Sequence, residues 1–186
     1  MNLRPTIVLT AVTTTVSALL IIAHNLTYVD TSGMLTEKLE RKCTELMGNG
    51  KYTLVSDWPG AGYDIEKPDD VEKLILKDNG SIAFEIIADG YNKGGLDLLI
   101  AMSSDGSVSG IAVVSITETP GLGSNVNDSG FLSEFEGICG EAVIVKKTPS
   151  TENEIEAVTG ATYSSKGVAA AVNTAVKTFA EMGAGK

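Results

Sequence analysis

The first part of the chain is one long apolar run. Residues 5–29 contain no Asp, Glu, Lys or Arg. A run of this length predicts a helix that can span a membrane. The threonines at positions 13–15 are compatible with such a helix because their hydroxyls can bond back to helix carbonyls. Arg4 precedes the run and Asp30 follows it, which favours a short cytoplasmic N-terminus.

We therefore expect a transmembrane anchor over residues 1–29 and an extracytoplasmic domain over residues 30–186, in a single-pass protein of the cell membrane. Three basic residues beyond the run weaken this orientation: Lys38, Arg41 and Lys42. The alternative for the run is a cleaved signal peptide. The run is longer than a usual signal core and no clear A-x-A site follows it, which favours a retained anchor.

The rest of the chain alternates between helical and strand-like periodicity. Apolar residues recur at helical spacing over residues 35–47 and again over 168–179, and glycines at positions 48 and 50 end the first of these helices. Strands are predicted over 71–77, 82–88, 96–102 and 108–116, with one more possible over 142–146. The turn formers at 78–80 and 104–106 predict hairpins. The pattern indicates an α+β domain, with a mixed or antiparallel sheet and packing helices at both ends.

Charge and cysteine content exclude several classes of function. The formal net charge is −10, which disfavours nucleic-acid binding because phosphate backbones are repelled. Cys43, Cys139 and the single histidine, His24, form no CxxC or other metal motif, so no metal site is expected from this chain alone. Two buried free thiols are favoured, and a disulfide between them is the alternative.

Two loops could carry chemistry. Residues 117–123 read Thr-Glu-Thr-Pro-Gly-Leu-Gly after a predicted strand, and residues 159–165 read Thr-Gly-Ala-Thr-Tyr-Ser-Ser before the last helix. The first could be an ordinary turn. In the second, small residues and free N–H groups at a helix start suit a phosphate, but Thr162 and Ser164 could equally cap the helix.

Together the two loops resemble the FMN-binding domain family, which is shared by the G-type subunit of the Rnf complex and the C-type subunit of the sodium-pumping NADH:quinone reductase. Residues 159–165 are similar to the family's [ST]-G-A-T-x-[ST]-S flavinylation motif, and residues 118–123 match its E-T-P-G-L-G loop. The family usually has Asp where this chain has Glu156, and often has His where it has Thr117. The length of the chain favours the Rnf subunit.

The resemblance implies FMN bound through a phosphoester to Thr162, with the E-T-P-G-L-G loop against the flavin. A separate flavin transferase that uses FAD and magnesium would attach it, because a threonine hydroxyl is a poor nucleophile without metal and base help. The implied flavin-binding residues are Thr162 and, around it, Thr159, Gly160, Ala161, Ser164, Ser165, Glu118, Thr119, Gly121, Leu122 and Gly123. No residue of the chain is expected to be catalytic by itself.

The implied function is electron transfer within an ion-translocating ferredoxin:NAD oxidoreductase (Rnf) complex. Its partners would be the multi-span membrane subunits and the iron–sulfur and flavin subunits of that complex. No G-x-G-x-x-G follows a predicted strand, so nicotinamide binding by this chain is not expected. The alternatives are a stand-alone extracytoplasmic flavoprotein, either a reductase or a redox-sensing module, and a pilin-like structural protein. A pilin would need a prepilin cleavage site, which is absent.

Overall fold

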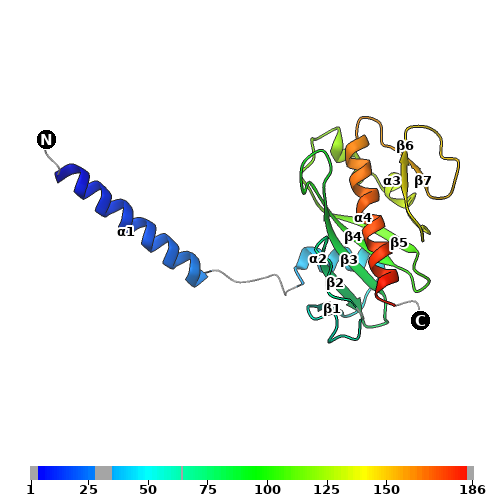
Figure 1. The fold of residues 1–186 in the computed structure, drawn as a ribbon, viewed down its shortest axis with the longest axis horizontal. Helices are drawn as coiled ribbons and strands as arrows, with labels where there is room; N and C mark the ends of the chain where they lie inside the picture. Colours follow the sequence, from blue (N-terminus) through cyan, green and yellow to red (C-terminus); the bar gives the residue numbers. More distant parts are fainter. Residues whose placement is uncertain (1–3, 28–34, 64, 184–186) are drawn as a thin grey trace. The chain divides into compact units, whose positions relative to one another are not determined.

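The computed structural model describes residues 4–27, 35–63 and 65–183 (Figure 1). The chain divides into two compact units, Met1–Gly33 and Met34–Lys186. The predicted boundary between residues 29 and 30 lies outside the described residues, as do both ends of the predicted anchor.

The first unit contains one helix, α1 (Arg4–Thr27). The hydroxyls of Thr13, Thr14 and Thr15 donate to the carbonyls of Leu9, Thr10 and Ala11 over 3.0, 2.8 and 2.8 Å, as the sequence predicts. The side chains of residues 7–23 are exposed. Among the described residues, no helix is long and apolar enough to cross a membrane.

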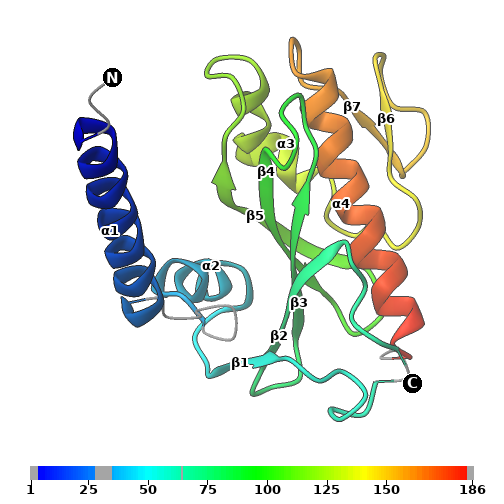
Figure 2. The ribbon, with the colours of Figure 1, turned by 60° about the vertical axis from the view of Figure 1, so that its left-hand side comes forward.

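The second unit is built on a five-stranded antiparallel sheet in which each strand pairs with the next along the chain. Figure 2 shows this meander with α4 running along it. The strands are β1 (Tyr52–Val55), β2 (Val71–Lys77), β3 (Ile82–Ala88), β4 (Leu96–Met102) and β5 (Val108–Ile116). The last four strands coincide with the predicted ranges, so the α+β fold with an antiparallel sheet is confirmed.

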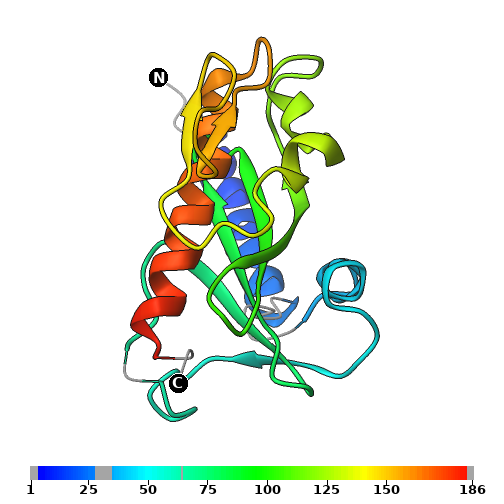
Figure 3. The same cartoon turned by 90° about the vertical axis from the view of Figure 1, so that its right-hand side faces the viewer.

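A helix covers each face of the sheet, with α2 (Glu37–Met47) on one side and α4 (Thr162–Glu181) on the other (Figure 3). Each helix has its own apolar cluster. Leu39 and Cys43 of α2 pack on Ile75 and Leu99, whereas Val168 and Val172 of α4 belong to the larger cluster on the opposite face. Both faces are therefore buried, and this explains why β3 and β4 are apolar almost throughout their lengths.

Local signals in the sequence set the ends of these elements. Thr36 caps α2 by accepting a hydrogen bond from Leu39 N–H over 3.3 Å, and Gly48 ends the helix with a φ of 75°. Gly80 and Gly106 have φ values of 88° and 86° in the two predicted hairpin turns. Only glycine adopts this left-handed conformation without steric cost, so the turn residues determine where the strands reverse.

The helix α4 lies very close to the loop that follows β3. A Cβ atom on Gly167 would be 2.4 Å from the carbonyl oxygen of Asp89 and 2.7 Å from a methyl of Leu96. At the next turns of the helix, Asn173 accepts from Ala142 N–H over 2.7 Å and donates to its carbonyl over 3.1 Å. These contacts hold the start of α4 beside the loops at one end of the sheet.

Several short elements were not predicted, or were predicted only in part. The two-stranded parallel sheet pairs β6 (Val143–Val145), close to the possible strand at 142–146, with β7 (Glu154–Glu156), which the sequence does not suggest. The strand β1 was also missed, as were the short helices η1 (Gly123–Asn127) and α3 (Ser129–Ser133). Elements of three to five residues are too short to show a periodic pattern.

The two cysteines are both free thiols in different environments. Cys43 is buried on the face of α2 that packs on the sheet, but Cys139 is exposed, so the expectation of two buried thiols is wrong for Cys139. Burial, and then the nearby charges of Glu85 and Glu40, raises the pKa of Cys43 to about 12. Since the thiolate is the reactive form, Cys43 is protected both by burial and by its protonation.

Thiol titration tests this difference between the cysteines. At mildly alkaline pH we expect the folded chain to react with Ellman's reagent at Cys139 alone, and at both free cysteines after denaturation. The substitution Cys139→Ser should abolish the reaction of the folded chain. Equal, fast reaction of both thiols in the folded chain would contradict the packing of α2 on the sheet.

Candidate functional site

The two loops that carry the sequence motifs meet at one end of the sheet. The first follows β5, and the second leads into α4. Between them lies a pocket of about 370 Å³. It is lined by Tyr91, Thr119, Leu122, Gly123, Gly160, Ala161, Thr162, Tyr163 and Ser164.

Thr162 is the first residue of α4 and lines this pocket. It is half-buried, and within the described part of the chain its hydroxyl makes no hydrogen bond. The residue before it, Ala161, occupies the N-cap position and has no side chain that could cap the helix. The first intrahelical bond is donated by Ser165 N–H to Ala161, over 2.8 Å. The N–H groups of residues 162–164 therefore remain available to an anion.

The two serines of the motif have structural roles instead. Ser165 is buried, and its hydroxyl accepts a hydrogen bond from Val158 N–H over 3.0 Å, which closes the turn before the helix. Ser164 is also buried and donates its hydroxyl hydrogen to Glu118. Of the three aliphatic hydroxyls at the start of α4, only that of Thr162 is left for chemistry.

Glu118 is the buried centre of the site. Its carboxylate accepts hydrogen bonds from Tyr91 N–H over 3.0 Å and from Asn92 N–H over 2.9 Å, in addition to the one from Ser164. Burial alone would raise the pKa of Glu118, but these three hydrogen bonds outweigh it and hold the pKa below its usual value. The carboxylate is thus ionised and points inward, and Glu118 is not among the residues that line the pocket.

Three glycines make room for this carboxylate. A Cβ atom added to Gly90, Gly95 or Gly123 would lie 2.7, 2.2 or 2.4 Å, respectively, from a carboxylate oxygen of Glu118. These separations are far below van der Waals contact, so no larger residue fits without displacing the carboxylate. Gly90 and Gly95 come from the loop after β3, whereas Gly123 belongs to the E-T-P-G-L-G loop. The glycines of two loops therefore enclose one buried charge.

The predicted site residues separate into two groups. Seven of them line the pocket: Thr119, Leu122, Gly123, Gly160, Ala161, Thr162 and Ser164. The other four do not: Thr159, which is exposed, Gly121, which has a φ of 74° in its turn, and the buried Glu118 and Ser165.

Two lining residues were not predicted from the sequence. Tyr91 lies in the loop after β3 and Tyr163 follows Thr162 in α4, and both side chains are largely exposed. Their ring centroids are 6.3 Å apart with an interplanar angle of 70°. The position of Tyr163 is the variable one in the motif, and residues 90–95 gave only a loop signal, so neither tyrosine stood out.

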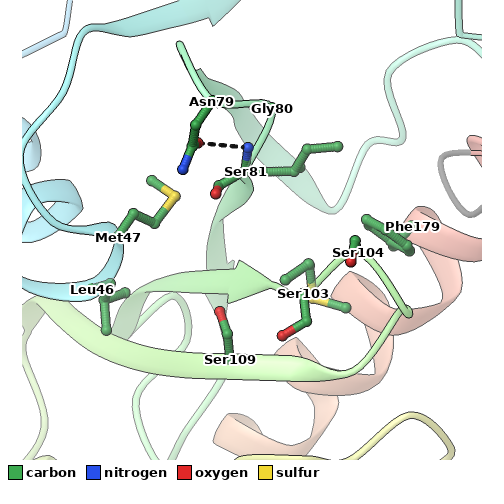
Figure 4. A pocket seen from close by; sticks show the side chains of 11 residues that line it. Leu46, Met47, Asn79, Gly80, Ser81, Ser103, Ser104, Ser109 and Phe179 are labelled. Atoms are coloured by element: carbon green, nitrogen blue, oxygen red, sulfur yellow. Dashed lines mark hydrogen bonds between the residues drawn. The ribbon is translucent and has the colours of Figure 1, made fainter.

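The described residues show no metal centre, and a cavity larger than the Thr162 pocket lies away from the motifs. In residues 4–27, 35–63 and 65–183, no group of three His, Cys, Asp or Glu side chains is placed to hold a metal ion. A cavity of about 460 Å³ lies at the other end of the sheet, where β3 begins and β4 ends (Figure 4). Its walls combine Leu46, Met47 and Phe179 with several serines, and no motif residue takes part in it.

The comparison with family models agrees with the geometry of the first pocket. Residues 90–177 match the model described as FMN-binding domain. The matched segment begins at the loop that carries Tyr91 and includes both motifs and most of α4. The resemblance indicated by the motifs is therefore confirmed.

Similar curated proteins are named as subunits of ion-translocating oxidoreductase complexes. The chain is 38% identical over 111 residues to the G-type subunit of the proton-translocating ferredoxin:NAD(+) oxidoreductase complex of Clostridium ljungdahlii, covering 59% of this chain and 60% of that protein. It is 34% identical over 122 residues to the G-type subunit of the Na(+)-translocating ferredoxin:NAD(+) oxidoreductase complex of Acetobacterium woodii, covering 62% and 58%. The matched region thus spans about 60% of the length of these relatives.

Solved structures with the same fold come from a different complex. The C-type subunit of the Na(+)-translocating NADH-quinone reductase of Parabacteroides distasonis has a TM-score of 0.52 and 21% identity, over 78% of this chain and 82% of that one. Shewanella oneidensis NqrC has a TM-score of 0.50 and 19% identity, over 80% and 88%. At this level of identity, the comparison shows that the α+β fold is shared.

The buried carboxylate provides a test of how the site is built. Glu118→Gln should lower the free energy of unfolding by about 1–3 kcal/mol, because a neutral amide offers one acceptor oxygen to donors that need two. The pKa of Glu118 is lower in the folded state than in the unfolded state. The stabilisation by its ionised carboxylate is therefore fully present above the unfolded-state pKa of about 4.3, and it is lost as the pH falls through the folded-state pKa.

Urea unfolding at a series of pH values measures both effects. The wild-type chain should lose stability on acidification more steeply than Glu118→Gln, and the two curves should converge at low pH. Glu152→Gln, which changes an exposed glutamate, serves as the control. Parallel curves for wild type and Glu118→Gln would contradict an ionised Glu118.

Proposed function

We propose that this chain carries FMN attached through a phosphoester to Thr162 and transfers electrons as the G-type subunit of an Rnf-type ion-translocating oxidoreductase complex. The single observation that supports this most strongly is the position of Thr162. Of the three aliphatic hydroxyls at the start of α4, that of Thr162 makes no hydrogen bond. Thr162 lines the pocket where the two motifs meet. The match of residues 90–177 to the FMN-binding domain supports the identity of the cofactor.

The residues around Thr162 fit a tethered FMN. The uncapped N–H groups at the start of α4 suit the ester phosphate, because a helix N-terminus favours negative charge. Gly160 and Ala161 are small and allow the phosphate to approach the backbone closely. Thr119 and Leu122 form the facing wall of the pocket. We assign the phosphate to the helix start and the flavin ring to the pocket.

Attachment of the flavin requires an enzyme that supplies a metal and a base. In the proposed reaction, the Thr162 oxygen forms a bond to the phosphorus of the FMN half of FAD. The phosphoanhydride bond of FAD breaks, AMP leaves, and the hydroxyl proton passes to a base of the transferase. Within the described residues, no acidic or histidine cluster could hold the magnesium ion that this step needs. Thr162 is therefore a substrate in this step.

When bound, FMN supplies transfer of one or two electrons at a time. The chain's own residues fix its position: the phosphoester prevents it from diffusing away, and the ionised Glu118 holds the walls of the pocket together. A fixed flavin suits an electron path between subunits. The relatives are named as parts of ion-translocating ferredoxin:NAD(+) oxidoreductase complexes, so the proposed partners are the other subunits of an Rnf complex and the flavin transferase.

We further propose that residues 1–29 anchor the chain in the cell membrane, with residues 30–186 on the extracytoplasmic side. The charge-free sequence of residues 5–29 supports the anchor. The apolar side chains of residues 7–23 are exposed, and the hydroxyls of Thr13, Thr14 and Thr15 are satisfied within the helix. A helix of this kind can be stable in lipid, where every polar group needs an internal partner.

Covalent attachment can be tested with the full chain expressed with and without a flavin transferase. After denaturing electrophoresis, we expect flavin fluorescence only in the presence of the transferase, and none in Thr162→Ala because the acceptor oxygen is missing. Thr162→Ser keeps a hydroxyl and should retain part of the signal. Fluorescence that persists in Thr162→Ala, or is absent from the wild type with an active transferase, would overturn the proposal.

The topology can be tested with the chain's own exposed thiol. In intact spheroplasts we expect a membrane-impermeant maleimide to label Cys139, and we expect the chain to stay in the membrane fraction after extraction with alkaline carbonate. Cys139→Ser should prevent labelling, and removal of residues 2–29 should release the domain. Labelling only after lysis would contradict the extracytoplasmic placement, and release by carbonate would contradict the anchor.

A further inference from the structure

The cavity at the end of the sheet opposite the motifs has the size of a ligand site. Its volume is about 460 Å³, and pockets that hold small molecules generally fall between about 300 and 1,000 Å³. Its walls come from the end of α2, the β2–β3 turn, the β4–β5 hairpin and the last turn of α4 (Figure 4). Phe179 in that last turn lies about 25 Å along the helix axis from Thr162, so the two pockets are separate.

One part of the cavity wall is apolar. Ile82, Met102 and Phe179 are buried and line it from the two hairpins and from α4. Leu46 and Met47, at the end of α2, are half-buried and complete this part of the wall. The thioether side chains of methionine are flexible and polarisable, and they make favourable contacts with aromatic rings. This part of the wall therefore suits a ring.

The other part of the wall consists of polar groups without partners. It is formed by Asn79, Ser81, Ser103, Ser104 and Ser109. Asn79 accepts a hydrogen bond from Ser81 N–H over 3.0 Å through its amide oxygen. Within the described part of the chain, its NH2 group and the four serine hydroxyls make no hydrogen bond. Figure 4 shows Asn79, Met47 and Ser109 facing the same space from three different elements.

These polar groups are all uncharged. None of the residues that line the cavity is ionisable, although 20% of the chain is charged. The ammonium of Lys77 donates to the carbonyl of Met47 and is not part of the lining. An ion that entered would lose water without meeting an opposite charge, and an anion would also be repelled by the net charge of −10. Hydroxyls both donate and accept, so they suit the oxygens of a neutral molecule.

We propose that this cavity is a second ligand site, which binds an uncharged ring compound that carries hydroxyl or carbonyl oxygens. The ring packs against Met47, Met102 and Phe179. Its oxygens form hydrogen bonds with the serine hydroxyls and with the NH2 group of Asn79. No motif residue lines the cavity, so the site is independent of the flavin and goes beyond the proposed function.

The test uses 2,7-dihydroxynaphthalene, an uncharged fused ring with two hydroxyls, and the full chain in lipid nanodiscs with 13C-labelled methionine methyl groups. We expect saturable shifts of the Met47 and Met102 methyl signals, with a midpoint at about 1 mM free probe or below. The indole N–H of Trp58, which is buried outside the cavity, should not shift. The compound 2-naphthoate has a similar ring but carries a negative charge, and it should leave all three signals unchanged.

Variants at Ser109, an exposed position on β5, locate the binding. Ser109→Ala should weaken binding by about 2- to 10-fold, which corresponds to the loss of one hydrogen bond. Ser109→Phe should abolish binding, because the new ring fills the cavity. Thr53→Phe, at an exposed strand position outside the cavity, is the matched control and should bind as the wild type does.

The outcomes decide the site and the class of ligand. Absence of saturable shifts at Met47 and Met102 overturns the site, as does wild-type affinity in a folded Ser109→Phe. If that variant does not fold, Ser109→Ala decides, and wild-type affinity there overturns the site. Equal binding of 2-naphthoate overturns the uncharged class of ligand. Attachment of flavin to Thr162 is measured separately, so the proposed function stands or fails without regard to these results.

Discussion

The site depends on the burial of one charge, the carboxylate of Glu118. An ionised carboxylate away from water is costly unless it is fully hydrogen-bonded. Here three donors come from the loop after β3 and from the start of α4, while Glu118 itself follows β5. The three segments must therefore come together for any of them to be stable, and the glycines at 90, 95 and 123 are required because the carboxylate fills the space that their side chains would need.

This arrangement explains why, of the three aliphatic hydroxyls at the start of α4, that of Thr162 is left without a hydrogen bond. Ser165 closes the turn before α4 and Ser164 is bound to Glu118, so both are buried and occupied. Thr162 occupies the first helical position, where its hydroxyl reaches the pocket. The negative charge of Glu118 is satisfied by its own donors, and the N–H groups of residues 162–164 have no intrahelical partner.

The sequence predicted the larger elements well because they are long and periodic. The ranges of β2 to β5 and the apolar face of α4 follow from alternation and helical spacing, and the hairpins follow from their glycines. The motifs led to Thr162 and its neighbours, but they could not show that the carboxylate of Glu118 is turned toward buried donors and does not line the pocket. That orientation depends on contacts with Tyr91 and Asn92, which lie far from it in the sequence. The same distance in sequence hid the pairing of Tyr91 with Tyr163.

The meander of the sheet has a consequence for the order of maturation. Each strand pairs with its neighbour in the chain, so the sheet contains mostly local contacts, which favour rapid folding. Thr162, the proposed acceptor, by contrast begins the last helix, and its surroundings are complete only when that helix has docked on a finished sheet. The proposed flavin transferase would then recognise a folded surface instead of a linear peptide.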